Sequence, residues 1–300
     1  MEINQYTGQA VVDFLFVSLN KQFDDTFKLY KPLYTKVGTV VPSKSRTEIY
    51  NWMGNIEKMR EWLGERVINN LKRYQWTIDN KDWEDTIEVE RNDVEDDMLG
   101  MIGNDAKNLG YAAASHPDEL IFDLMLGGFA NLCFDGTPFF NDSHPLGPNG
   151  LLQSNLGHGA LNEANYAAAR AQMMSLVDEA GRPLNLVPDL LITGPALEGM
   201  ARSILMPGLT AATTRDWVGT AEYLVVPMLS TNPNAWYLID TKRPMKPFIY
   251  QTRKPLQFVQ MNKPTDYPVF MNKKFIFGCD CRDNAGYGLW PLCYGSDGTA

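Results

Sequence analysis

Residues 73–97 read RYQWTIDNKDWEDTIEVERNDVEDD, and residues 98–140 continue with MLGMIGNDAKNLGYAAASHPDELIFDLMLGGFANLCFDGTPFF. In the first part, apolar and polar residues alternate over 74–78 and again over 86–90. Period two is typical of a half-buried strand, and the polar residues 79–82 between the two runs predict a turn. We therefore expect an acidic β-hairpin, which must lie on another structure because an isolated hairpin is marginally stable in water.

The second part of this stretch predicts a long helix over 93–134. Asn92 or Asp93 provides the N-cap, and the acidic residues that follow suit the positive end of the helix dipole. Pro117 predicts a break, after which the helix restarts with Pro at its first position. From Leu120 onward the helix is apolar nearly all round, so we expect most of its surface to be buried.

Upstream of the hairpin, residues 1–34 predict an amphipathic helix that ends before Pro32. Its apolar stripe consists of Val11, Phe14, Leu15, Leu19, Phe23 and Phe27. Residues 35–43 predict an extended segment, and residues 46–63 a second helix or an irregular segment.

Downstream, residues 136–159 are rich in Gly, Pro, Asn and Ser, which favours a loop and a domain boundary. The remainder predicts a mixture of helices and strands, so the fold class is α+β. Helices are expected at 162–180 and 195–205, and strands at 188–192, 221–227, 235–240, 248–250, 256–261 and 274–280.

Composition excludes several classes of protein. The net charge is −9, whereas a nucleic-acid-binding domain normally carries a basic patch. Residues 79–97 alone hold ten acidic and two basic residues. The N-terminus lacks the basic and apolar regions of a signal peptide, and no apolar run is long enough to span a membrane. The four cysteines have no metal-binding spacing, so we expect free buried thiols.

Asp142, Ser143 and His144 are residue types of a nucleophilic triad, so a hydrolase is one alternative function. However, triad members come from separate parts of a chain, and three adjacent residues favour an ordinary polar turn. The three histidines have no metal-binding spacing, and the acidic cluster lacks the EF-hand pattern. We therefore expect no catalytic, cofactor-binding or metal-binding residues, and a protein that is not an enzyme.

The hairpin is better explained as a surface that contacts another copy of the chain. The predicted subunit-interface residues are Tyr74, Trp76, Ile78, Trp83, Ile87, Glu88, Val89 and Glu90. Basic residues between Lys242 and Lys274 are candidates to receive the acidic hairpin of a neighbouring copy. Charge reversal at Glu88 and Glu90 tests this hypothesis.

Four long segments resemble the major head subunit of Mu-like phages and prophages. They are VVPSKSRTEIYNWMG (40–54), REWLGERVINNLKRYQWTIDNKDWEDTIEVERNDVEDD (60–97), AAASHPDELIFDLMLGGFANLCFDGTPFFNDSHP (112–145) and PDLLITGPALEG (188–199). Together they cover about 40–199, with weaker similarity towards the C-terminus. The resemblance implies a Hong Kong 97-type capsid fold with an N-terminal arm, an extended β-hairpin called the E-loop, a spine helix and an axial domain.

Carried onto this chain, that fold implies five regions. They are an N-terminal arm and lead-in at 1–64, the E-loop hairpin at 65–92, the spine helix of the peripheral domain at 93–150, the axial domain at 151–245, and C-terminal strands of the peripheral or axial domain at 246–300. Some relatives remove an N-terminal scaffolding segment by proteolysis. Because the first amphipathic helix is predicted to begin near Met1, we expect little such segment here.

The resemblance also implies a function. The chain is expected to be the major capsid protein of a tailed, Mu-like bacteriophage that self-assembles into hexamers and pentamers of an icosahedral shell. Its expected partners are other copies of itself, scaffold, portal and decoration proteins, with DNA enclosed but not bound sequence-specifically, and with no membrane and no cofactor. It is expected in the virion, and in the host cytoplasm during assembly. A virion decoration or adaptor protein is the second alternative, beside the hydrolase.

Overall fold

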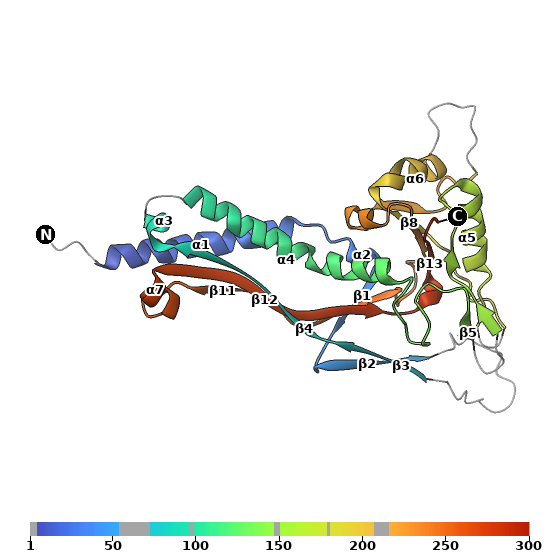
Figure 1. The fold of residues 1–300 in the computed structure, drawn as a ribbon, viewed down its shortest axis with the longest axis horizontal. Helices are drawn as coiled ribbons and strands as arrows, with labels where there is room; N and C mark the ends of the chain where they lie inside the picture. Colours follow the sequence, from blue (N-terminus) through green and yellow to red (C-terminus); the bar gives the residue numbers. More distant parts are fainter. Residues whose placement is uncertain are drawn as a thin grey trace.

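A computed structural model describes residues 5–53, 73–95, 99–146, 151–178, 181–206 and 216–299. The molecule has a long, narrow part that contains the N-terminal helix and a compact part that contains the C-terminus (Figure 1). A four-stranded sheet runs along the narrow part, and a five-stranded sheet lies in the compact part. Helices and strands therefore mix as the α+β prediction requires.

The four-stranded sheet has the order β1-β11-β12-β4. Two 14-residue strands, β11 (Phe248–Met261) and β12 (Lys274–Tyr287), form its antiparallel centre. Strand β1 (Gly38–Pro42) pairs in parallel with β11, and β4 (Lys81–Glu90) pairs antiparallel with β12. The sequence predicts two separate short strands within 248–261, whereas the structure has one strand with register irregularities between Thr252 and Gln257.

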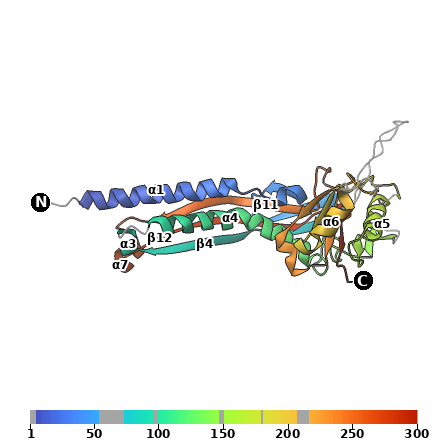
Figure 2. The same cartoon turned by 90° about the horizontal axis from the view of Figure 1, so that it is seen from above.

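Helices α1 (Gln5–Leu29) and α4 (Leu99–Gly127) lie side by side over this sheet (Figure 2). Their apolar faces and the sheet share one buried core, in which Leu19 and Phe23 meet Leu109 and Phe277. Of the predicted stripe on α1, Leu15, Leu19 and Phe23 are buried there, whereas Phe14 and Phe27 are exposed. Residues 47–53 form a strand, so the prediction of a helix or an irregular segment over 46–63 is wrong for that part, and 54–63 lie outside the described residues.

The predicted hairpin, with strands at 74–78 and 86–90 around a turn at 79–82, is wrong. Strand β3 (Arg73–Asp79) pairs antiparallel with β2 (Thr47–Met53), and β4 pairs with β12 instead of with β3. The chain turns a corner at Asn80, where it leaves one sheet and enters another. Alternation of apolar residues reports that a segment is a strand but carries no information on its partner, which here lies far away in sequence.

The predicted break at Pro117 is also wrong, because α4 is continuous from Leu99 to Gly127. Proline inside a helix removes one backbone hydrogen bond and costs about 3 kcal/mol. The buried residues on both sides of it, such as Leu109 and Phe122, offset that cost by packing into the core. The helix ends at Gly127, and a short helix, α3 (Arg91–Glu95), precedes it.

The compact part is built on the order β7-β13-β10-β8-β9. These strands are β7 (Leu156–Gly157), β13 (Cys293–Ser296), β10 (Trp236–Ile239), β8 (Leu190–Thr193) and β9 (Glu222–Val225). Helices α5 (Glu163–Met174) and α6 (Glu198–Leu205) pack on it, α5 being shorter than the predicted helix. A large core that includes Phe122, Phe139 and Tyr237 joins this sheet to α4.

The remaining elements are short. They are α2 (Tyr34–Val37), β5 (His144–Leu146), β6 (Leu151–Gln153), α7 (Tyr267–Asn272) and the 3-10 helices Pro195–Leu197, Pro227–Thr231 and Trp290–Leu292. All four cysteines are free and buried, as predicted. In the described part of the chain, no helix is both long and apolar enough to cross a membrane.

The two long helices approach each other closely at Gly110. A Cβ atom at this position would lie 2.6 Å from the backbone oxygen of Phe23 on α1. We expect Gly110→Ala to lower the free energy of unfolding by about 1–3 kcal/mol, because one helix backbone must shift. Gly199→Ala is the matched control: it is also in a helix, nothing lies within 4 Å of the added Cβ, and it should be neutral or stabilising. Equal denaturant midpoints for the two variants would contradict this prediction.

Candidate functional site: a projecting hairpin and its surroundings

The hairpin formed by β2 and β3 projects from the side of the long sheet opposite to α1 and α4 (Figure 1). The two strands pair from Thr47↔Asp79 to Met53↔Arg73. At its base, Ile78 is 4% exposed and packs against Ile249 on β11. Ile49, further along β2, is exposed. The hairpin is thus anchored at its base, and from there its two strands, β2 and β3, extend away from the body of the subunit.

A buried polar network fixes the base of this hairpin. The side-chain amide of Asn80 donates to Ser43 Oγ (2.7 Å) and to the Ser45 carbonyl (2.8 Å). Its oxygen accepts from Gln251 Nε2 (2.9 Å), which also donates to the Ile78 carbonyl. The oxygen of Gln251 accepts from Tyr50 Oη. Because the network joins β1, β2, β3 and β11, it sets the angle at which the hairpin leaves the sheet.

Glu48 stabilises the base of the hairpin at the protein surface. Its Oε1 accepts hydrogen bonds from the backbone amides of Lys44 (2.6 Å) and Ser45 (3.0 Å) and from Ser43 Oγ (2.9 Å). These bonds favour the charged form and lower the pKa of Glu48 to about 2. The carboxylate therefore holds the turn between β1 and β2 in place.

The depressed pKa of Glu48 gives a pH prediction. Because the folded-state pKa lies below the unfolded value, the carboxylate stabilises the fold above the unfolded pKa of about 4.3, and this contribution disappears as the pH falls toward 2. NMR titration of the side-chain carboxyl carbon should give a midpoint near 2. The exposed carboxyl of Asp25 on α1 serves as the internal reference. A midpoint near 4 for Glu48 would contradict the three-donor geometry.

The structure distributes the eight predicted interface residues among different environments. Ile78 is buried in its own chain, and Ile87 and Val89 pack against the core under α1 and α4. Trp76 is half-buried between the two cores. The Trp83 indole donates to the Asp283 carbonyl and faces His116.

Glu88 and Glu90 are exposed on β4, and the side chain of Tyr74 lies outside what the structure describes. Much of the apolar surface of Trp83, Ile87 and Val89 is therefore buried within the subunit. Of the two exposed acidic residues, Glu88 is paired with Lys274 of the same chain, and Glu90 stays available to another copy.

Part of the acidic charge on β4 is neutralised inside the chain. Lys274 on β12 forms an ion pair with Glu88, and Arg282 lies 3.5 Å from Asp82. Lys274, one of the basic residues that we expected to receive the hairpin of a neighbouring copy, is thus paired within its own chain. Since β4 is an edge strand of the sheet, its remaining charges also oppose unwanted strand pairing.

An apolar surface at the tip of the narrow part was not predicted. Tyr267, Phe270 and Met271 on α7 are exposed, Phe270 to 75%, and Val259 and Met261 at the end of β11 are exposed beside them. Exposed apolar surface of this kind is typical of sites of protein contact. The signal in the sequence is the run YPVFM at 267–271, which lies between Asp266 and the basic residues Lys273 and Lys274.

The structure does not assemble Asp142, Ser143 and His144 into a triad. His144 is 0% exposed, with its Nδ1 2.6 Å from Asp135 Oδ2 and its Nε2 3.0 Å from Asn155 Oδ1. Its ring stacks on Trp290 at 4.0 Å. The exposed Ser143 Oγ instead donates to Asp142 Oδ1.

Burial raises the pKa of Asp135, but the hydrogen bond and charge of His144 outweigh this and hold the pKa below its ordinary value. His144 thus fastens β5 to the core as a structural residue, and the predicted loop over 136–159 contains the short strands β5, β6 and β7. The geometry gives no support to the hydrolase alternative.

A spine helix along an open sheet, a projecting hairpin and a second compact sheet define a phage capsid protein of the Hong Kong 97 type. A chain of the procapsid of bacteriophage JBD30 superposes with a TM-score of 0.60 at 31% identity, over 96% of this chain and 75% of that one.

The family described as "Mu-like prophage major head subunit gpT" matches residues 12–160, 150–229 and 228–299, and the chain belongs to this family. The Mu-like prophage FluMu major head subunit of Haemophilus influenzae is 30% identical over 288 residues, which cover 96% of this chain and 73% of that protein. The major capsid protein of Escherichia phage Mu is 29% identical over 283 residues, with coverages of 94% and 72%. These matches confirm the predicted family, fold class and capsid function.

Proposed function

We propose that this major head protein self-assembles into the hexamers and pentamers of an icosahedral shell that encloses DNA. The observation that carries the proposal is the projecting β2–β3 hairpin with its fixed base. A hairpin that leaves the subunit at a set angle is suited to lie over an adjacent copy, whose surface supplies the contacts that two strands alone lack. Closed symmetry then repeats each contact around the ring.

In this assembly the exposed residues on β4 supply charged groups to the interface between subunits, and the hairpin supplies most of the surface area that is buried there. Glu90 contributes to contacts with a neighbouring copy at the edge of the long sheet, where Glu88 is already paired with Lys274 of its own chain, and β3 contributes Tyr74 and Trp76. Ile78, Trp83, Ile87 and Val89 support the interface from within the subunit. The projecting hairpin is made by β2 and β3, within 47–79, and replaces the predicted hairpin at 65–92 and the end of the predicted arm at 1–64. The other proposed regions are the spine at 93–150, the axial domain at 151–245 and the C-terminal strands at 246–300.

Negative-stain electron microscopy of the purified full chain over a range of concentrations tests self-assembly. Shells, tubes or capsomer rings are the expected result, and a persistent monomer at high concentration would overturn the proposal. Glu90→Lys should reduce the yield of assemblies if the β4 edge contacts a neighbour. Asp25→Lys, the same reversal at an exposed position on α1, controls for the change in net charge.

Three further components belong to this proposal. Scaffold, portal and decoration proteins are its expected partners, assembly takes place in the host cytoplasm, and the shell holds DNA without reading its sequence. The net charge of −9 supports the last point, because a subunit with net negative charge repels the phosphates of DNA. The protein acts by assembly and not as an enzyme.

A further inference from the structure

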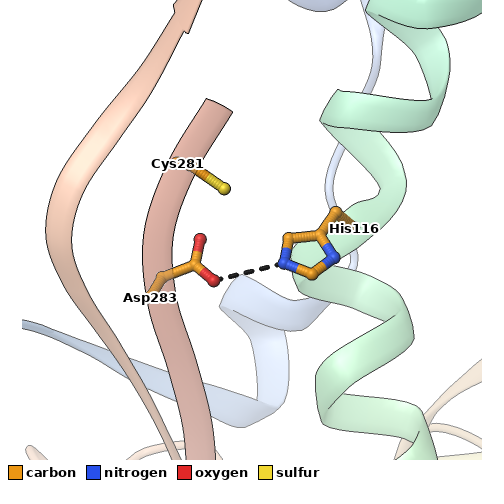
Figure 3. A group of neighbouring side chains, drawn as sticks. All are labelled: His116, Cys281 and Asp283. Carbon is orange, nitrogen blue, oxygen red and sulfur yellow. Dashed lines mark hydrogen bonds and ion pairs between the residues drawn. The ribbon is translucent and has the colours of Figure 1, made fainter. Parts of the chain in front are cut away.

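Three side chains that are typical metal ligands meet between the spine helix and the long sheet. His116 comes from α4, and Cys281 and Asp283 come from β12, where a spacing of two residues places both on the same face (Figure 3). One ligand atom from each residue lies within 4.8 Å of the other two. His116 Nε2 is 3.2 Å from Asp283 Oδ1, close to the separation of two ligands on one tetrahedral zinc ion.

The surroundings of Asp283 favour a cation at this position. Its carboxylate is 2% exposed, and within the described part of the chain its ion-pair partner is His116, not a lysine or arginine. Burying a carboxylate without a permanently charged partner is costly. Tyr250 donates to the second oxygen, Oδ2, at 2.6 Å. A hydrogen bond of this kind orients a ligating carboxylate and leaves Oδ1 directed at the other two ligands.

The cluster is also reachable from solvent. A cavity of about 150 Å³ lies beside it, lined by Trp83, Glu119 and Cys279 as well as by His116 and Cys281. A water occupies about 30 Å³ of liquid, so the cavity holds an ion together with a water ligand. Glu119 and Cys279 are alternative sources of a fourth ligand. The ring of Trp83 packs on His116 at 4.7 Å and restricts its rotation.

We propose that His116, Cys281 and Asp283 bind a divalent metal ion with affinity for nitrogen and sulfur, Zn²⁺ in the first place. One imidazole, one thiolate and one carboxylate form a mixed ligand set that suits Zn²⁺ and not Mg²⁺ or Ca²⁺. Binding forms a zinc–sulfur bond and releases the Cys281 thiol proton to solvent. The imidazole keeps one proton, on Nδ1, so that Nε2 can bind the metal. The bound ion then links α4 covalently to β12 across the layer boundary.

Titration of the full chain with Co²⁺, which reports its ligands through absorption, tests the site. A thiolate-to-cobalt charge-transfer band with the visible bands of tetrahedral Co²⁺ is expected at one equivalent, and Zn²⁺ should displace it. Cys281→Ser and His116→Gln should abolish the charge-transfer band or the tetrahedral spectrum, respectively, while circular dichroism stays unchanged. Tyr250→Phe should weaken the affinity for Zn²⁺ about 10-fold to 100-fold, as for other partners of metal ligands.

A matched control comes from a second group of ligand-type residues, Cys133, Asp135 and His144. There both ring nitrogens of His144 already have hydrogen-bond partners. Cys133→Ser should therefore leave the cobalt spectrum unchanged. A band that survives Cys281→Ser but is lost in Cys133→Ser would overturn the proposal, and so would the absence of any charge-transfer band in the native protein.

Discussion

Replacing Asn80 by leucine is expected to abolish regular shells while the subunit still folds. Leucine has a similar volume but makes none of the hydrogen bonds to Ser43, Ser45 and Gln251. Each buried polar group left without a partner costs about 1–3 kcal/mol, so we expect a loss of about 2–3 kcal/mol in unfolding free energy. The larger effect is on the hairpin, whose angle to the sheet is no longer fixed.

Two measurements separate these effects. Hydrogen exchange of the backbone amides in β2 and β3 should become faster in Asn80→Leu, while exchange in β12 changes little. Electron microscopy should then show irregular aggregates or free subunits. Asn284→Ala is the matched control, because Asn284 also donates to this corner, at the Asp79 carbonyl, but is only half-buried. Slow exchange in β2 and β3 together with normal shells would refute the role of Asn80.

The second large effect is expected for Asp118→Ala. Asp118 is 0% exposed in the middle of α4 and accepts hydrogen bonds from Tyr30 Oη (2.6 Å) and from the backbone amides of Leu33 (2.9 Å) and Tyr34 (2.5 Å). It therefore ties the segment after α1 to the spine helix. Alanine leaves these donors without their acceptor, and we expect the free energy of unfolding to fall by about 3 kcal/mol or more.

Chemical denaturation followed by circular dichroism measures this loss. Asp123→Ala is the control, since Asp123 lies on the same helix but is exposed. That variant should be neutral or slightly stabilising, because alanine has the higher helix propensity. If both variants unfold at the same denaturant concentration, Asp118 does not anchor the segment.

The nature of most elements could be predicted from the sequence, but the partners of the central strands could not. Alternation over 73–90 correctly indicates strands, and the apolar stripe on the first helix correctly places Leu15, Leu19 and Phe23 in the core. The error at Asn80 arises because a polar residue between two strands is as compatible with a buried corner as with an exposed turn. Only the positions of Ser43 and Gln251, which are distant in sequence, distinguish the two.

Long-range contacts explain the other differences as well. In the sequence, Asp118 follows Pro117 and therefore looks like an acidic residue in the first turn of a helix. In the structure its carboxylate instead accepts hydrogen bonds from Tyr30, Leu33 and Tyr34. His116 and Cys281 lie far apart in the chain, so no local spacing predicts that they meet. By contrast, the segments that resemble the family include the residues of the hairpin and of the spine helix, and this resemblance correctly predicts the fold class.

The order of strands in the long sheet has a consequence for folding kinetics. Both outer strands precede their partners by a long stretch of chain: Gly38 pairs with Phe248, and Glu90 pairs with Lys274. Such high contact order slows folding, because a large loop must close before the contacts form. During synthesis, β4 is therefore made long before the ribosome has delivered β12. Until then β4 has no partner strand, and its many carboxylates keep it hydrated and repel other nascent chains. This repulsion lowers the risk of aggregation when a host cell makes many copies at once.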